Sequence, residues 1–318
     1  MGDAVDKVVG KVVDKKARKV SRRTKVGIAV IAACLAAGGL WYYTAGQRHW
    51  PEKVLDLGNN VKMRLVRIPA GKFMMGSPAT EARRGGDEGP QHEVTISKPF
   101  YMGVFEVTQK QYEQVMGVNP SRFKGAKNPV EMVSWDEAAE FCRKLSAKTG
   151  KKVMLPTEAQ WEYACRAGTT TAFNTGDALK PGQANADIPS NPGVWDTIMA
   201  WVGKFLPQKA KTIPTTPAGS FPPNGFGLYD MHGNVWELCS DWYADSYANL
   251  PAGQAGAKNQ DPAGSDSGTL RVLRGGSWGC NPQFCRSALR FRCPPDYRDL
   301  IIGFRVAVDL PAGQSGSE

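Results

Sequence analysis

Two carboxylates flank a glycine-bearing bend between residues 224 and 237, and together they could bind a hard cation. The stretch reads NGFGLYDMHGNVWE, with Asp230 before the bend and Glu237 after it. Such a bend can turn backbone carbonyl oxygens toward the point that both carboxylates reach, and calcium prefers a set of oxygen ligands of this kind. The alternative is that Asp230 and Glu237 only accept hydrogen bonds that stabilise turns.

Cysteines are the second group of residues that could carry chemistry. Cys34 lies in an apolar run near the N-terminus, and six more follow it: Cys142, Cys165, Cys239, Cys280, Cys285 and Cys293. In an oxidising compartment these six permit up to three disulfides, whose pairing the spacing does not fix. The three histidines are scattered, and no pair has the spacing of zinc ligands, so no zinc site is predicted.

The elements that must position these groups begin with strands. Residues 61–77 and 93–107 alternate well enough between apolar and polar side chains to predict an antiparallel sheet where the domain opens. Residues 169–224 and 243–270 are rich in Gly, Pro, Ser, Asn and Asp without periodicity, which predicts long packed loops. Buried Trp, disulfides or cations are the groups that could hold such loops in place.

Two helices are predicted from their caps. Ser134-Trp135-Asp136-Glu137 is a capping box before an apolar run, and Gly150 follows as a stop. Thr157-Glu158-Ala159-Gln160 opens a second helix that ends by Gly168. Together with the strands, these helices indicate an α+β domain over residues 61–309, preceded by a linker at 44–60 and followed by a flexible tail at 310–318.

The N-terminal part has the pattern of a membrane anchor. Residues 26–43 form an uncharged run, VGIAVIAACLAAGGLWYY, which is long enough for one transmembrane helix. The basic segment 1–25 precedes it, so the positive-inside rule places the N-terminus in the cytoplasm and the main domain in the periplasm or outside the cell. Two alternatives stay open: a lipoprotein attached at Cys34, and a cleaved signal peptide.

The net charge does not describe the main domain. Of the 40 Lys and Arg residues that give the chain a formal charge of +10, ten lie in the first fifty residues beside three Asp, which leaves +3 for the rest. A domain with so small an excess lacks the basic surface that nucleic-acid binding requires. The sequence therefore predicts no nucleic-acid partner, and contact with a membrane only through residues 26–43.

Four motifs in order resemble the formylglycine-generating-enzyme, or sulfatase-modifying-factor, family. They are FMMGS at 73–77, LPTEAQWEY at 155–163, NGFGLYDMHGNVWE at 224–237, and RGGSW at 274–278 followed by GFR at 303–305. The resemblance covers about 250 residues of this chain. It implies an irregular α+β fold related to the C-type lectin fold, and calcium held by the side chains of Asp230 and Glu237 with the carbonyls of Gly233 and Val235.

The resemblance also implies a possible activity. Enzymes of this family are copper-dependent oxidases that use O₂ to convert a cysteine of a sulfatase Cys-x-Pro-x-Arg segment to formylglycine. Cys280 and Cys285 have the position and the Cys-x4-Cys spacing of the two thiolates that bind Cu(I) in such enzymes. The following stretch, RSALRFRCPPDYRDLII, departs from the enzymes and is typical of members not known as formylglycine generators. The alternative, typical of those members, is a structural Cys285, and a bond to Cys165 is one form of it.

A second resemblance concerns the C-terminal segment. Within the frame GGSW…NPQ.CRSA.R.R..PD.R…IGFR, eleven positions hold residues that an Asn codon AAC can become when only its adenines are randomised. This pattern resembles the variable region of diversity-generating-retroelement target proteins, some of which use the same fold to display a ligand-binding face. It predicts a non-catalytic module with a protein or glycan ligand, bound by Phe284, Leu289, Phe291, Tyr297, Asp299, Leu300 and Ile301. The other four positions are Gly279, Cys280, Cys293 and Pro294, and the alternative for the apolar side chains is that they belong to the core.

Overall fold

A computed structural model describes residues 50–188, 214–249 and 259–310 of the chain. The predicted cytoplasmic segment, the predicted membrane span and nearly all of the predicted tail lie outside these residues. Within them, no helix is both long and apolar enough to cross a bilayer.

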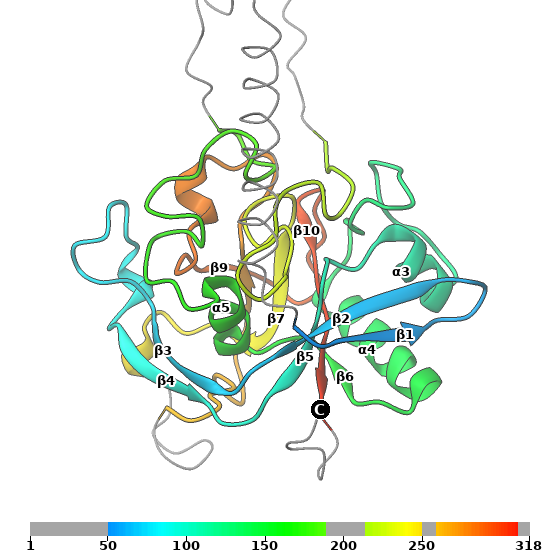
Figure 1. The fold of residues 1–318 in the computed structure, drawn as a ribbon, viewed down its shortest axis with the longest axis horizontal. Coiled ribbons are helices and arrows are strands. Elements are labelled where there is room, and N and C mark those ends of the chain that lie inside the picture. Colours follow the sequence, from blue (N-terminus) through cyan, green and yellow to red (C-terminus); the bar gives the residue numbers. More distant parts are fainter. Residues whose placement is uncertain (1–49, 189–213, 250–258, 311–318) are drawn as a thin grey trace, which may run out of the picture. The chain divides into compact units, whose positions relative to one another are not determined.

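A five-stranded antiparallel sheet brings the two ends of the described domain together (Figure 1). Its strands, in spatial order, are β1 (Glu52–Asp56), β2 (Lys62–Ile68), β5 (Phe100–Gly103), β11 (Ala307–Asp309) and β6 (Val153–Met154). The predicted opening strands form and are antiparallel, but the prediction of one sheet is corrected: residues 62–68 and 100–103 lie in this sheet, whereas residues 71–75 and 92–96 form a separate two-stranded sheet. The predicted linker is corrected at residues 52–56, because this stretch pairs along its whole length with β2 and buries Leu55.

Two smaller sheets complete the β-structure. One has the order β10 (Ile302–Gly303), β7 (Trp236–Trp242), β8 (Arg271–Arg274) and β9 (Phe291–Cys293), with β10 parallel to β7. The other pairs β3 (Gly71–Met75) with β4 (His92–Ile96), and short 3₁₀-helices lie at η1 (Gly86–Glu88), η2 (Tyr247–Asn249) and η3 (Pro282–Cys285). The predicted C-terminal segment therefore runs from the end of β8 through η3 and β9 to β10.

Both predicted helices form, and the structure adds a third. α4 (Trp135–Thr149) and α5 (Glu158–Arg166) begin at the predicted capping boxes, and Gly150 ends α4 in the left-handed conformation. The additional helix, α3 (Gln109–Met116), has the same signals, with a capping box from Thr108 and a left-handed Gly117 at its end. α5 lies against β3, β7 and β8, so it connects the two smaller sheets (Figure 1).

Buried arginines hold the long loops in place. Arg274 and Arg305 are fully buried, and Arg166, Arg286 and Arg290 are nearly so. Each pairs with a buried glutamate: Arg166 and Arg274 with Glu162, Arg286 with Glu88, Arg290 with Glu158, and Arg305 with Glu237. A buried charge pair is tolerated when further hydrogen bonds satisfy both partners, and these guanidinium groups also donate to loop carbonyls. The sequence prediction named Trp, disulfides and cations for this task and missed the arginines.

Candidate functional site

Cys280 and Cys285 lie together after β8, where two glycines turn the chain. Gly275 and Gly276 have φ angles of +95° and +78°, in the region that favours glycine. A Cβ on Gly276 would stand 2.4 Å from the Cys285 Sγ, so the turn passes directly beneath this thiol. Both cysteines pack against one small apolar cluster that contains Phe173 and Leu179. The two predicted thiols are thus brought into one neighbourhood.

The chemical state of this pair is set by burial. Burial and the neighbouring Cys280 raise the pKa of the Cys285 thiol well above its usual range, so Cys285 is protonated at neutral pH. Cys280 is half-buried, and its Sγ lies 3.2 Å from the Oγ of the buried Ser277. Two adjacent thiols form a soft donor set, and this set fits Cu(I) better than a hard cation. Binding of a metal here would require loss of the Cys285 proton.

The cysteines of the described domain are all free thiols. Cys165 is buried beside the Ser287 hydroxyl at 3.7 Å and His232 Nε2 at 3.9 Å, and it forms no bond with Cys285. The suggested pairing of Cys165 with Cys285 is therefore not present in this structure. Burial raises the pKa of Cys165 to about 12, which keeps it an inert thiol.

The predicted calcium ligands lie in a buried acidic cluster. Asp230 and Glu237 share it with Glu106, whose pKa is raised by burial and by the charges of the other two carboxylates. Arg305 donates to both oxygens of Glu237 at 2.6 Å, and Trp161 Nε1 donates to one of them at 2.7 Å. Glu237 thus already has a counter-charge.

The other end of the bend leaves oxygen atoms without partners. Asp230 accepts a hydrogen bond from the Gly219 amide through one oxygen, while its Oδ1 and the Glu106 Oε1 are buried with no partner. Gly233, at φ +84°, lies so close to Asn185 that a Cβ would meet its carbonyl oxygen at 2.2 Å, and Val235 packs on Gly303. The two orphaned oxygens suit a hard cation. No group of three His, Cys, Asp or Glu residues in the described ranges is arranged to hold a metal ion, so calcium at Asp230, Gly233, Val235 and Glu237 stays a prediction.

The eleven codon-compatible positions lie almost entirely at the surface. Ten are exposed or half-buried, and only Cys293 is buried. Phe284, Phe291 and Tyr297 are 42%, 46% and 47% exposed, and they are the aromatic members of the exposed large hydrophobic residues in the described ranges. The frame residues of the segment are divided. Seven are buried, Cys285, Arg286, Ser287, Ala288, Arg290, Ile302 and Gly303, and seven are exposed or half-buried, Asn281, Pro282, Gln283, Arg292, Pro295, Asp296 and Arg298. The arbitrary positions are thus mostly exposed or half-buried, while the frame between them contributes both buried and surface residues.

Part of this surface lies around two tryptophans, Trp236 of β7 and Trp278 of the frame. The Phe291 ring stacks on Trp236 with ring centroids 5.0 Å apart. The Ile301 carbonyl accepts from the Trp236 amide at 2.7 Å, and the Leu300 carbonyl accepts from Trp278 Nε1 at 3.3 Å. Tyr297 donates to the Asp299 carboxylate at 2.8 Å. Leu289 and Ile301 also pack on the main core, so the alternative that these side chains are core holds in part for them.

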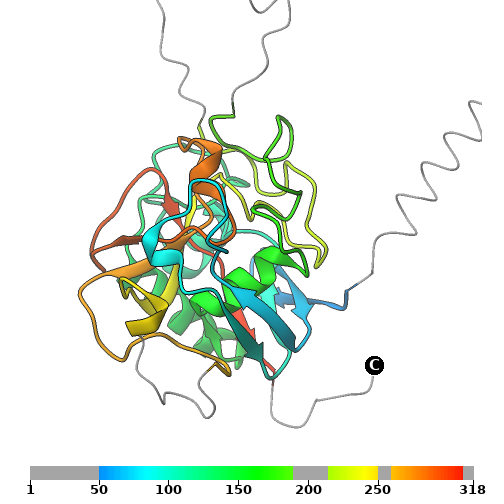
Figure 2. The same cartoon turned by 90° about the vertical axis from the view of Figure 1, so that its left-hand side faces the viewer.

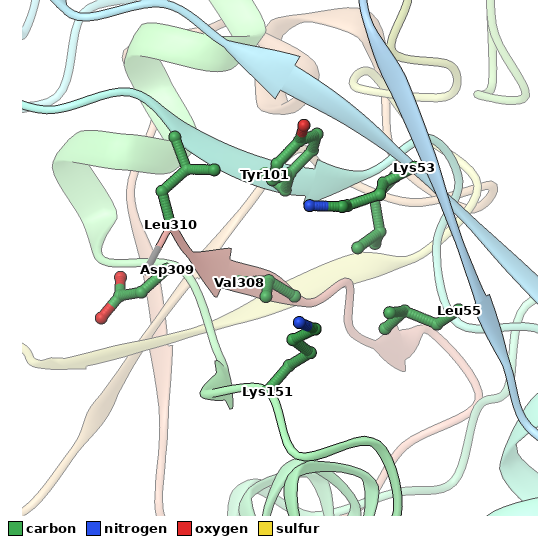
Figure 3. Close-up of a pocket in the computed structure, with 8 residues that line it drawn as sticks. Lys53, Leu55, Tyr101, Lys151, Val308, Asp309 and Leu310 are labelled. Atoms are coloured by element: carbon green, nitrogen blue, oxygen red, sulfur yellow. The ribbon is translucent and has the colours of Figure 1, made fainter. Parts of the chain in front are cut away.

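A small pocket on the five-stranded sheet takes no part in this arrangement. Figure 3 shows it between Lys53, Tyr101 and Lys151, near the end of β11. Its volume of about 10 Å³ holds no more than a single water molecule. None of the predicted site residues lines it.

Comparisons with known proteins show which family the chain belongs to. The model of the sulfatase-modifying factor enzyme 1-like domain matches residues 56–310. The formylglycine-generating enzyme of Mus musculus is 31% identical over 306 residues, which cover 77% of this chain and 75% of that protein. The inactive C-alpha-formylglycine-generating enzyme 2 of the same species is 29% identical over 315 residues, covering 80% of this chain and 88% of that protein.

A solved structure adds a relative of another kind. Variable protein 1 of Treponema denticola superposes with a TM-score of 0.64 and 29% identity, over 81% of this chain and 99% of that one. The family thus includes enzymes, an inactive paralogue and a variable protein, and the relation to C-type lectins stays a prediction. The chain belongs to the sulfatase-modifying factor enzyme 1-like family and has its α+β fold.

Proposed function

We propose that the domain is a ligand-binding module and that its recognition surface is formed by the codon-compatible positions between Gly279 and Ile301. The observation that carries the proposal is the exposure of ten of these eleven positions, among them the large rings of Phe284, Phe291 and Tyr297, since a diversified binding face requires its variable side chains at the surface. The likeness to a variable protein supports the same function. We further propose that residues 26–43 anchor the module to a membrane and present it on the outer side.

The chemistry of this surface suits a protein or glycan ligand. Phe284, Phe291 and Tyr297 expose large rings, and aromatic side chains contribute much of the binding energy in recognition surfaces. Asp299 adds a carboxylate whose position is fixed by the Tyr297 hydroxyl. Polar groups among aromatic anchors give orientation to a bound partner.

Substitutions at exposed arbitrary positions and at buried frame positions of residues 279–301 should differ in their effect on the free energy of unfolding. We expect Tyr297→Asn to change the free energy of unfolding by less than about 1 kcal/mol, because the ring is half exposed and packs on no core cluster. Ala288→Asn, at a fully buried frame position, is the matched control and should cost about 1–3 kcal/mol or more. Denaturant unfolding of both variants measures the difference, and equal losses would argue that Tyr297 is structural.

The genome offers a test of diversification itself. We expect DNA near the gene to contain a near-copy of codons 271–305 with adenines at the arbitrary positions. Sequencing the DNA that flanks the gene tests whether this near-copy exists. If no such copy exists, diversification is excluded, and only a fixed recognition surface remains.

A copper-dependent oxidase is the second candidate, favoured by one observation. Cys280 and Cys285 are free, adjacent to one apolar cluster and close to the Ser277 hydroxyl. In an oxidase these two cysteines would hold Cu(I), which supplies the chemistry with O₂, and a peptide cysteine would have to reach the half-buried Cys280.

Mass spectrometry distinguishes the two candidates. A Cys-x-Pro-x-Arg peptide is incubated with the full-length protein, Cu(I), a thiol reductant and O₂, beside the variant Cys280→Ser. We expect the peptide thiol to remain unchanged with both proteins. An aldehyde formed by the unaltered protein and abolished by Cys280→Ser would establish the oxidase and reverse the order of the candidates.

A further inference from the structure

A cavity of ligand size lies on the side of η3 that carries Pro282 and Gln283. Its volume is about 530 Å³, within the range of small-molecule sites. Three segments far apart in the sequence line it: residues 78–83, residues 170–179, and η3 with Arg286. Figure 2 shows η3, in orange, beside the loop that leads from β3 to β4, in cyan. None of the eleven codon-compatible positions lines the cavity, although Phe284 directly follows the lining residue Gln283 in η3.

A buried guanidinium fixes the walls of this cavity. Arg286 donates to Glu81 Oε1 at 2.5 Å, to both carboxylate oxygens of Glu88, and to the Arg83 carbonyl at 2.9 Å. These bonds tie the loop 78–88 to η3. Arg83 is held at φ +64°, a conformation that costs a residue with a side chain about 1–2 kcal/mol. Strain of this kind persists where the surrounding structure determines it, which is common at binding sites.

The cavity carries charged and polar side chains with no partner among the described residues. Arg83 and Asp177 are exposed, and neither side chain forms a hydrogen bond or ion pair there, with the other or with a third residue. The side chains of Thr80, Thr170 and Gln283 are equally free of hydrogen bonds within the described part of the chain. The floor is apolar, with Phe173 and Leu179 buried beneath it.

The charges on the wall select the ligand class. Glu81 and Glu88 both bond to Arg286, so none of these three groups is free for a ligand. Arg83 and Asp177 are then the charged side chains of the lining that have no partner among the described residues. A ligand with only a carboxylate would leave Asp177 unpaired, and a ligand with only an ammonium group would leave Arg83 unpaired. A molecule with both groups satisfies both side chains, and the threonine hydroxyls and the Gln283 amide can bind polar atoms between them.

We propose that this cavity binds a small zwitterion, with the carboxylate of the ligand at Arg83 and its ammonium group at Asp177. Two sources share this chemistry, free amino acids and short free peptides. Neither Cys280 nor Cys285 lines the cavity, although its floor residues Phe173 and Leu179 belong to the apolar cluster on which both cysteines pack. The proposed ligand site does not use the two thiols or the exposed rings.

Calorimetry on the full-length protein tests the site with defined probes. The probes are single L-amino acids and the dipeptides Gly-Gly and Ala-Ala, with acetate and methylamine as ligands of one charge. We expect saturable binding of at least one zwitterion and none of acetate or methylamine. Tighter binding of dipeptides than of amino acids would identify peptides as the source, and the reverse would identify amino acids.

Two variants and two matched controls locate the binding. Arg83→Gln and Asp177→Asn should each weaken binding at least about tenfold, because each removes one charge-assisted contact. Lys180→Gln and Asp187→Asn alter exposed charges that do not line the cavity and should leave the affinity unchanged. The proposal is overturned if no zwitterion binds saturably, if the single-charge ligands bind equally well, or if both variants bind like the unaltered protein. Tyr297→Asn should not affect this binding, so failure here is distinguishable from failure of the recognition surface.

Discussion

Replacing Arg274 by methionine is expected to lower the free energy of unfolding by about 3–5 kcal/mol. The Arg274 guanidinium is fully buried, pairs with Glu162, and lies 3.5 Å from Glu158. It also donates to the backbone carbonyls of Ser287, Ala288 and Leu289 at 2.8–2.9 Å. Methionine fills a similar volume but leaves Glu162 with a buried negative charge that only Arg166 still offsets, and it leaves these three carbonyls without a donor.

An exposed arginine provides the control for this measurement. Arg143 pairs with Glu140 on the outer face of α4, where solvent screens the interaction. Arg143→Met should leave the unfolding transition in guanidinium chloride almost unchanged when tryptophan fluorescence follows it. Equal transitions for Arg143→Met and Arg274→Met would show that the buried Arg274 does not stabilise residues 287–289, whose carbonyls it binds.

Replacing Gly276 by alanine should cost about 2–5 kcal/mol, through two effects at one residue. The left-handed φ of +78° is unfavourable for alanine, and its Cβ would stand 2.4 Å from Cys285 Sγ and 3.0 Å from the Phe284 carbonyl oxygen. The turn can relieve this overlap only by moving η3 away from β8. Both the apolar cluster around Cys285 and the exposed ring of Phe284 would then shift.

Gly117 separates the two effects. It ends α3 at φ +81°, nearly the same conformation, but a Cβ there would meet nothing within 4 Å. Gly117→Ala should therefore cost only the conformational part, about 1–2 kcal/mol. Thermal unfolding of both variants gives the comparison, and a Gly276→Ala loss no larger than that of Gly117→Ala would contradict the close packing beneath Cys285.

Local signals in the sequence predicted the local parts of the fold. The capping boxes at Ser134 and Thr157 set the starts of α4 and α5, because each cap is made by residues three apart. The same signal at Thr108 is present for α3, so that helix could have been predicted as well. β1 was missed because its alternation is weak, with Val54 exposed and the strand at the edge of its sheet.

Contacts between distant residues were beyond the reach of such signals. The partners of Arg286 lie about 200 residues earlier, at Glu81 and Glu88, and no periodic pattern connects them. The cavity beside η3 depends on the same contacts, so its lining could not be derived from any one segment. The Cys280 and Cys285 pair was predicted from the resemblance to the family, whose enzymes have two cysteines at this position and spacing. The association of Glu106 with Asp230 and Glu237 was not predicted, because Glu106 lies more than a hundred residues before them in the chain.

The position of β11 links the integrity of the five-stranded sheet to the C-terminal part of the chain. This strand follows the recognition segment in the chain but lies inside the five-stranded sheet, between β5 and β6. A polypeptide that terminates anywhere in 279–301 lacks a central strand, and the strands on either side lose their hydrogen-bonding partner. We therefore expect that a chain ending within residues 279–301 does not complete this sheet, so that the segment before β11 is displayed only by a chain that extends through β11.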